Sequence, residues 1–256
     1  MPNDVRDLDV VLLHGLGGSA RSWDGVVALR PAGLRLLSLD LPGHGAEAGD
    51  PRLSLDGLQA AVADALVPLG ARPWLLVGHS MGGKVAALLT AAAERTADPV
   101  APPAGVLLVD PSPPSPEPMA AQRRARMLGW WSDGPIGRAD AEEYVDANCS
   151  SPLPADARDL AIQQVRRSAG DAWRAWLTGG SLEDRGAEVG RLRTPAVVLA
   201  GESDEDLGLD AQRRLVLPHW GDAVLEPVAG AAHFVPQERP DAVAEAIVRL
   251  RARAGV

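Results

Sequence analysis

A serine occupies a position that suits nucleophilic catalysis. Ser80 is the centre of Gly78-His79-Ser80-Met81-Gly82, which follows an apolar run and precedes a helical pattern. A serine between strand and helix sits on a tight turn, so its neighbours two residues away must be small. The turn raises the hydroxyl toward the positive end of the helix. We therefore predict that Ser80 is a nucleophile. A glycine-rich connection without chemistry is the alternative, and a phosphate-binding loop would need a hydroxyl where Val85 stands.

A serine hydroxyl becomes nucleophilic when a base takes its proton, and His233 is the best placed of the five histidines. It follows the last apolar run, on the side where parallel strands gather ligands. The others lie elsewhere: His14 and His44 in loops, His79 toward the other side of its strand, and His219 at the opposite edge of the sheet. His233 is the predicted general base.

An acidic segment, Gly201-Glu202-Ser203-Asp204-Glu205-Asp206, follows the fifth apolar run. A carboxylate must hold the imidazole tautomer and stabilise the imidazolium. We predict that Asp204 does so for His233. Asp110, which ends the fourth apolar run, is the alternative acid, and a solvated acidic loop without a catalytic role also fits the charge run.

Backbone donors for an oxyanion are available in His14-Gly15-Leu16-Gly17-Gly18, which follows the first apolar run. The amides of Leu16 and Met81 are predicted to form an oxyanion hole. A flexible glycine-rich loop is one alternative. A dinucleotide-binding fingerprint is another, but its third glycine is missing, although Asp40 stands at a suitable distance.

The segments that must position these residues alternate between short apolar runs and helical patterns. Strands are predicted over 9–13, 34–39, 74–77, 106–109, 195–200 and 223–228, and helices near 22–29, 54–69, 81–93, 209–217 and 240–253. Most strands lack polar alternation, as expected when both faces are covered. The pattern predicts an α/β fold with a mostly parallel, doubly wound sheet.

One span breaks this rhythm. The proline-rich segment 111–118 opens a region of helical patterns that ends near Thr194. We interpret 111–194 as a helical cap, inserted over the strand ends of a core formed by 1–110 and 195–256. The alternative is a set of extra core helices at one edge of the sheet. Four of the seven tryptophans fall in this span: Trp130, Trp131, Trp173 and Trp176.

Composition excludes several classes of protein. Lys and Arg total 25 against 34 Asp and Glu, and the net charge of -9 argues against binding nucleic acid. No apolar stretch approaches the roughly 20 residues that cross a bilayer, so no membrane insertion is expected. The polar opening MPNDVRDLD predicts no secretory signal, and the lone Cys149 indicates a reducing compartment, the cytoplasm.

Taken together, the motifs resemble the α/β-hydrolase superfamily. The matching segments are HGLGGS at 14–19, DLPGHG at 40–45, GHSMGG at 78–83, GESD at 201–204 and His233, in the family's order. The resemblance implies a Ser-His-Asp triad, a helical cap after the family's sixth strand, no cofactor or metal, and usually acyl transfer to water. The family's extra initial strands have no counterpart here, so about six strands are expected.

The same resemblance implies a substrate pocket. By analogy with the family, Trp23 lines it, and Trp130, Trp131, Trp176 and Phe234 are expected beside it. The serine is incompatible with the dehalogenase and epoxide hydrolase branches, which use an aspartate. We expect a serine esterase whose small-molecule partner is a largely apolar carboxylic ester. A lyase or carbon–carbon bond hydrolase, as in the menaquinone-pathway branch, and a non-catalytic ligand-binding protein are the alternatives.

Overall fold

The computed structural model describes residues 7–95, 101–132 and 134–256. Most of the opening segment, for which no secretory signal is predicted, lies outside these residues. Six parallel strands form one sheet in the order β2-β1-β3-β4-β5-β6. Their bounds are β1 Leu8–Leu13, β2 Leu34–Leu39, β3 Trp74–His79, β4 Gly105–Val109, β5 Ala196–Gly201 and β6 Ala223–Val228. The predicted six-stranded parallel sheet is confirmed.

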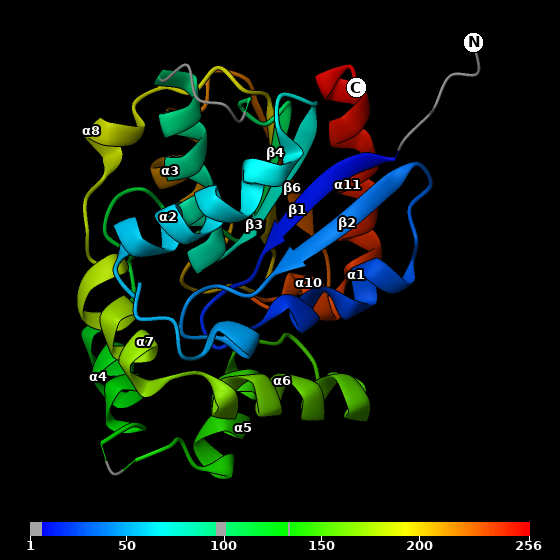
Figure 1. Ribbon diagram of the computed structural model, residues 1–256. Coiled ribbons are helices and arrows are strands. Elements are labelled where there is room, and N and C mark those ends of the chain that lie inside the picture. The colour runs from blue at the N-terminus through cyan, green and yellow to red at the C-terminus, as the bar shows by residue number, and fades with distance from the viewer. Residues whose placement is uncertain (1–6, 96–100, 133) are drawn as a thin grey trace.

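Helices cover both faces of the sheet (Figure 1). One face carries α1 (Asp24–Ala28) and α11 (Pro240–Ala254), and the other carries α2 (Leu55–Leu66) and α3 (Met81–Arg95). Successive side chains of a strand point to opposite faces, so Val10 and Leu12 join one apolar cluster while Val11 and Leu13 join the other. This double burial explains why the strands lack polar alternation.

The segment after β4 is mostly helical. Its helices α4 (Ala121–Gly129), α5 (Arg138–Ala147), α6 (Ala155–Arg167) and α7 (Gly170–Ala175) gather at one end of the sheet, the end toward which the arrowheads of β1 and β2 point (Figure 1). A π-helical turn (Trp176–Gly180) and α8 (Gly186–Val189) lead back to β5. Buried cap side chains such as Trp173 belong to the same apolar cluster as Leu13, so the cap continues the core over the strand ends.

Shorter elements complete the described chain. They are 3-10 turns at Ala20–Trp23, Gly45–Glu47, Val67–Leu69 and Leu217–His219, a π-helical turn at Gln212–Val216, and the helices α9 (Leu209–Ala211) and α10 (Val235–Glu238). In the described ranges no helix combines the length and the apolar character that crossing a bilayer requires.

The strand order marks where a ligand is expected. β1 lies between β2 and β3, so the chain leaves β1 toward one side of the sheet and returns on the other. In such sheets ligands bind beyond the carboxyl ends of the strands at this reversal. The residues that follow β1 and β3 are the glycine-rich turn at 14–18 and Ser80.

Candidate active site

Ser80 lies on a sharp turn between β3 and α3, with a φ of 50°. The two flanking glycines are required by the closeness of the backbone. A Cβ on Gly78 would lie 2.5 Å from the carbonyl oxygen of Gly82, and a Cβ on Gly82 would lie 2.5 Å from that of Leu13. The turn therefore needs glycine on both sides of the serine, as the sequence predicts.

A continuous hydrogen-bonded relay runs from this serine. Nε2 of His233 lies 2.9 Å from Oγ of Ser80, and Nδ1 lies 2.7 Å from Oδ2 of Asp204. Because only an N–H can satisfy the carboxylate, the proton sits on Nδ1 and leaves Nε2 free to accept from the serine hydroxyl. The other oxygen of Asp204 accepts the backbone N–H groups of Asp206 and Leu207 at 3.0 and 2.9 Å.

The electrostatics of this relay stabilise His233 after it has taken up a proton. Burial alone would raise the pKa of Asp204, but the charge and hydrogen bond of His233 lower it to about 2. Burial would lower the pKa of His233, but the carboxylate of Asp204 outweighs burial and raises it. An imidazolium beside a carboxylate is the state that forms when the base has taken the serine proton.

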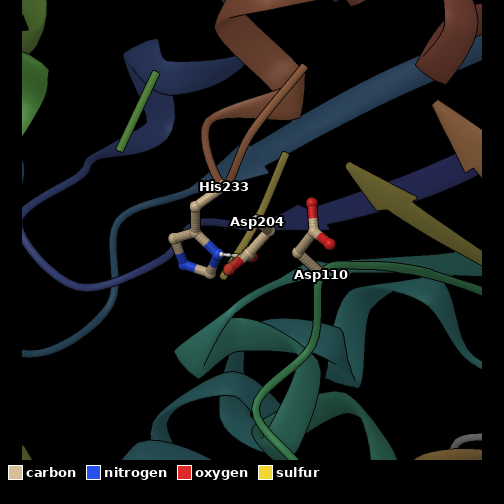
Figure 2. A group of neighbouring side chains, drawn as sticks. All are labelled: Asp110, Asp204 and His233. Atoms are coloured by element: carbon tan, nitrogen blue, oxygen red, sulfur yellow. Dashed lines mark hydrogen bonds and ion pairs between the residues drawn. The ribbon is translucent and has the colours of Figure 1, made fainter. Parts of the chain in front are cut away.

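Asp110 lies beside the relay without joining it (Figure 2). Its fully buried carboxyl accepts the N–H of Gly201 at 3.0 and 3.2 Å, and burial and the neighbouring Asp204 raise its pKa well above the usual range. Ligand atoms of Asp110, Asp204 and His233 lie within 4.8 Å of one another, a spacing that a metal ion could use. These atoms already bond to one another or to the backbone, as the dashed line to Asp204 shows.

Three other histidines are held by the backbone in neutral form. Nε2 of His79 donates to the carbonyl oxygen of His233 at 2.8 Å, so this residue supports the loop that carries His233. His14 accepts the N–H of Leu41 at 3.0 Å through Nε2. Burial lowers the pKa of His79 to about 3 and that of His44 to about 4, and it also lowers the pKa of His14.

The two predicted oxyanion donors flank the serine. Leu16 lines the same cavity as Ser80, and Met81 is the first residue of α3. Across 7–95, 101–132 and 134–256, no acceptor takes the backbone N–H of either residue. The cap fixes this turn, because the hydroxyl of Tyr144 donates to the carbonyl oxygen of Leu16 at 3.0 Å. Both amides are therefore available to a ligand.

Comparison with known proteins decides the family. Residues 10–246 match the alpha/beta hydrolase family. The chain belongs to this family. It is 32% identical, over 91% of its length and 86% of the relative's, to a pimeloyl-[acyl-carrier protein] methyl ester esterase from Aromatoleum aromaticum. It is 28% identical, over 94% and 90%, to a 2-succinyl-6-hydroxy-2,4-cyclohexadiene-1-carboxylate synthase from Enterobacter sp. (strain 638).

Solved structures agree on the fold of this α/β hydrolase. An esterase from Exiguobacterium antarcticum superposes with a TM-score of 0.83, covering 98% of this chain and 93% of the other at 14% identity. At such low identity the likeness shows the shared fold alone. The resemblance suggested by the sequence motifs is thus confirmed at the level of family and fold.

The cavity of the α/β hydrolase opens beside Ser80. Leu16, Met119, Met127, Trp176 and Leu207 form its apolar lining, while Glu117, Arg123, Tyr144, Asn148 and Asp206 bring polar groups. The pocket is therefore more polar than the sequence predicted.

Of the five aromatic residues that are expected to line the pocket, four lie outside the wall of this cavity. Trp176 lies in the wall, as predicted. Trp23 is fully buried in the apolar cluster of the sheet face that carries α11, so it does not reach the cavity. Trp130 and Trp131 pack around Trp173 inside the cap.

Phe234 is the fourth aromatic residue that lies outside the wall of the cavity. Its ring lies between those of Tyr144 and His79, beside a smaller hollow under the glycine-rich turn. The polar wall was missed by sequence reasoning, because Glu117, Arg123 and Asn148 belong to no motif. The one available signal was that Glu117 stands in the proline-rich segment directly after a strand end.

Proposed function

We propose that this α/β hydrolase is a serine carboxylic ester hydrolase that works through an acyl-enzyme intermediate. The observation that carries the proposal is the unbroken relay of Ser80, His233 and Asp204 at the edge of a cavity. The esterase name of the Aromatoleum relative supports the same reaction class. The relay needs no cofactor to activate the nucleophile.

In the first half-reaction Oγ of Ser80 attacks the ester carbonyl carbon while its proton moves to Nε2 of His233. The carbonyl oxygen becomes negative, and the N–H groups of Leu16 and Met81 bind it, each donor contributing about 100- to 1000-fold in turnover. Asp204 stabilises the imidazolium. His233 then protonates the leaving alcohol oxygen as the C–O bond breaks, which leaves the acyl group on Ser80.

The second half-reaction releases the acid. Water attacks the acyl carbon while His233 takes a proton from it, and the second tetrahedral intermediate is held by the same two amides. The bond to Oγ breaks, and His233 returns its proton to Ser80. Each group therefore ends in its starting state, as catalysis requires.

The substrate class follows from the cavity. Its apolar wall suits an ester with an acyl or alkyl chain against Met119, Met127 and Trp176. We place the enzyme in a reducing compartment such as the cytoplasm. The chain holds one cysteine, Cys149, and burial raises the pKa of its thiol to about 12, so that the thiol is a poor nucleophile.

A second reaction is supported by the Enterobacter relative, whose name is that of a synthase. With the same residues, His233 and Ser80 would relay a proton in a lyase or carbon–carbon bond hydrolase. The products formed from a panel of esters, lactones and β-diketones distinguish the two reactions. Release of acid and alcohol from esters alone supports the esterase.

The decisive experiment replaces the serine. Ser80→Ala should lower the turnover of 4-nitrophenyl butyrate by about 10⁴-fold or more. Its melting temperature should stay close to that of the wild type, and Ser132→Ala serves as a matched control with full activity. A fluorophosphonate probe should label the wild type and not Ser80→Ala. Unchanged turnover in Ser80→Ala would remove this residue from the reaction, and an unlabelled wild type would favour a non-catalytic ligand-binding protein.

A further inference from the structure

Glu117 brings a carboxylate to the wall of the catalytic cavity. It lies in the segment between β4 and α4, and only 8% of its surface is exposed. Its backbone N–H donates to the carbonyl oxygen of Ser181 at 2.8 Å, which fixes it to the far end of the cap. Ser80 and His233 line the same cavity. A buried acid therefore faces the place where a substrate must sit.

The two oxygens of this carboxylate have different surroundings. Oε1 accepts the hydroxyl of Ser112 at 2.6 Å, and the N–H of Ser112 donates to the carbonyl oxygen of Ser80 at 3.0 Å. Oε2 is buried and has no partner among the described residues. This residue lies in the wall of the catalytic cavity, where a ligand could supply the missing bond.

The cations nearby do not supply that bond. Lys84 donates to two backbone carbonyl oxygens, and Arg123 pairs with Asp206. Arg124 donates through Nη1 to a carbonyl oxygen and a hydroxyl, and its buried Nη2 does not bond to Glu117. Burial raises the pKa of Glu117, and the Ser112 hydroxyl and the surrounding positive charges only partly oppose it. A donor brought by the substrate would favour the ionised carboxylate.

We propose that Glu117 selects esters that carry a hydrogen-bond donor, a hydroxyl or an ammonium group, within reach of its Oε2 when the ester carbonyl lies at Ser80. This specificity rests on the proposed esterase function. A methyl group in the same place would leave the carboxylate oxygen both desolvated and unpaired. Sites built to bond a substrate hydroxyl discriminate strongly against the analogue that lacks it. Glu117 is thus a specificity-determining residue.

The test uses esters that differ by one group. Ethyl 3-hydroxybutanoate and ethyl 3-aminobutanoate are compared with ethyl 3-methylbutanoate for a donor on the acyl side. On the alcohol side, 2-hydroxyethyl butanoate is compared with propyl butanoate. In at least one comparison the wild type should show a kcat/KM about 10- to 100-fold higher for the ester with the donor.

Two variants examine the carboxylate itself. Glu117→Gln keeps an oxygen for Ser112 but turns an amide nitrogen toward the cavity, and Glu117→Met removes both polar atoms. The ratio of kcat/KM between donor and methyl esters should fall about tenfold in each, most steeply for the ammonium ester with Glu117→Gln. Glu143→Gln, which removes an exposed carboxylate from the same cap, should keep the wild-type ratio.

The possible results separate this specificity from the reaction itself. If the wild type hydrolyses methyl and donor esters equally well, the specificity is wrong while the esterase stands. If the variants lose turnover of every ester equally, Glu117 supports His233 electrostatically and does not select substrates. If the wild type hydrolyses none of these esters and no other, both the esterase and its specificity are overturned.

Discussion

At the scale of single residues, Asp204 and Asp110 lie close together but have different hydrogen-bond partners. Asp204 bonds to His233, whereas Asp110 bonds to the N–H of Gly201. Asp204→Asn should therefore lower kcat/KM for 4-nitrophenyl butyrate by about 10³- to 10⁴-fold, since the imidazole loses its orienting carboxylate. Asp110→Asn should cost about tenfold or less, because an amide oxygen can still accept from Gly201. The opposite order of effects would make Asp110 the catalytic acid.

In the proposed mechanism, the protonation of His233 sets the acid limb of the pH profile. Burial lowers its pKa, but Asp204 reverses this and raises it above the ordinary 6.5. Because the base must be neutral to accept the serine proton, kcat/KM should fall with decreasing pH at a midpoint above 6.5. Removing the carboxylate in Asp204→Asn should move the midpoint to lower pH. Profiles of kcat/KM from pH 5 to 9 test this, and a common midpoint for both proteins would contradict it.

The site residues that the sequence could predict are the ones that the backbone of the sheet places. Ser80, Asp204 and His233 each follow a strand, so the parallel sheet alone carries them to one edge. No such rule predicts which residues form the wall of the cavity. Glu117 is held at the site by a local hydrogen bond to Ser112 and a backbone hydrogen bond to the distant Ser181, and the sequence does not show which face of the sheet Trp23 packs against.

At the scale of elements, the bend at Ser80 depends on how closely α3 approaches β1. A Cβ on Gly82 would lie 2.5 Å from the carbonyl oxygen of Leu13, which cannot move without distorting the sheet. Helix propensity favours alanine over glycine by about 1 kcal/mol, but overpacking against backbone costs about 1–3 kcal/mol or more. The clash dominates, so Gly82→Ala should lower the free energy of unfolding and the esterase activity.

A second glycine serves as the control for that prediction. Gly129 ends α4, and a Cβ there would meet nothing within 4 Å. Gly129→Ala should therefore raise the free energy of unfolding by up to about 1 kcal/mol and leave activity intact. Urea denaturation of both variants measures the two effects. Equal stabilisation by both substitutions would show that α3 can shift to admit a methyl group.

Strands and helices were predictable to different extents. The strands are apolar runs covered on both faces, and all six were predicted to within two residues. β3 runs on to His79 because Gly78 and His79 pair with β4, which an apolar pattern cannot show. In the cap, no apolar periodicity marks α5, because Arg138–Ala147 is rich in charge and buries only Ala141, Tyr144 and Val145.

At the scale of the whole molecule, one side chain joins both ends of the cap to the core. Lys84, the chain's only lysine, lies fully buried in α3. Its ammonium donates to the carbonyl oxygens of Ser115, near the start of the cap, and Glu183, near its end, at 3.3 and 2.7 Å. The cap that carries Glu117 and Tyr144 to the site is therefore joined to the core by the hydrogen bonds of one buried side chain.

The pH dependence of stability tests this anchor. Burial lowers the pKa of Lys84 to about 8, whereas in the unfolded chain it stays near 10.5. Between these values the unfolded state binds the extra proton, so the contribution of Lys84 to the free energy of unfolding rises with pH, by about 3 kcal/mol in total. Below pH 8 both states hold the proton and the contribution is constant. Lys84→Met lacks this titration.

Urea denaturation of the wild type and Lys84→Met at pH 7, 8, 9 and 10 measures the difference. The free energy of unfolding of the wild type should increase relative to that of the variant from pH 8 upward, whatever their order at pH 7. Other groups titrate in both proteins and cancel in the comparison. Parallel pH curves would mean that Lys84 keeps an ordinary pKa in the folded protein. The hydrogen bonds to Ser115 and Glu183 would then offset the cost of burying the ammonium.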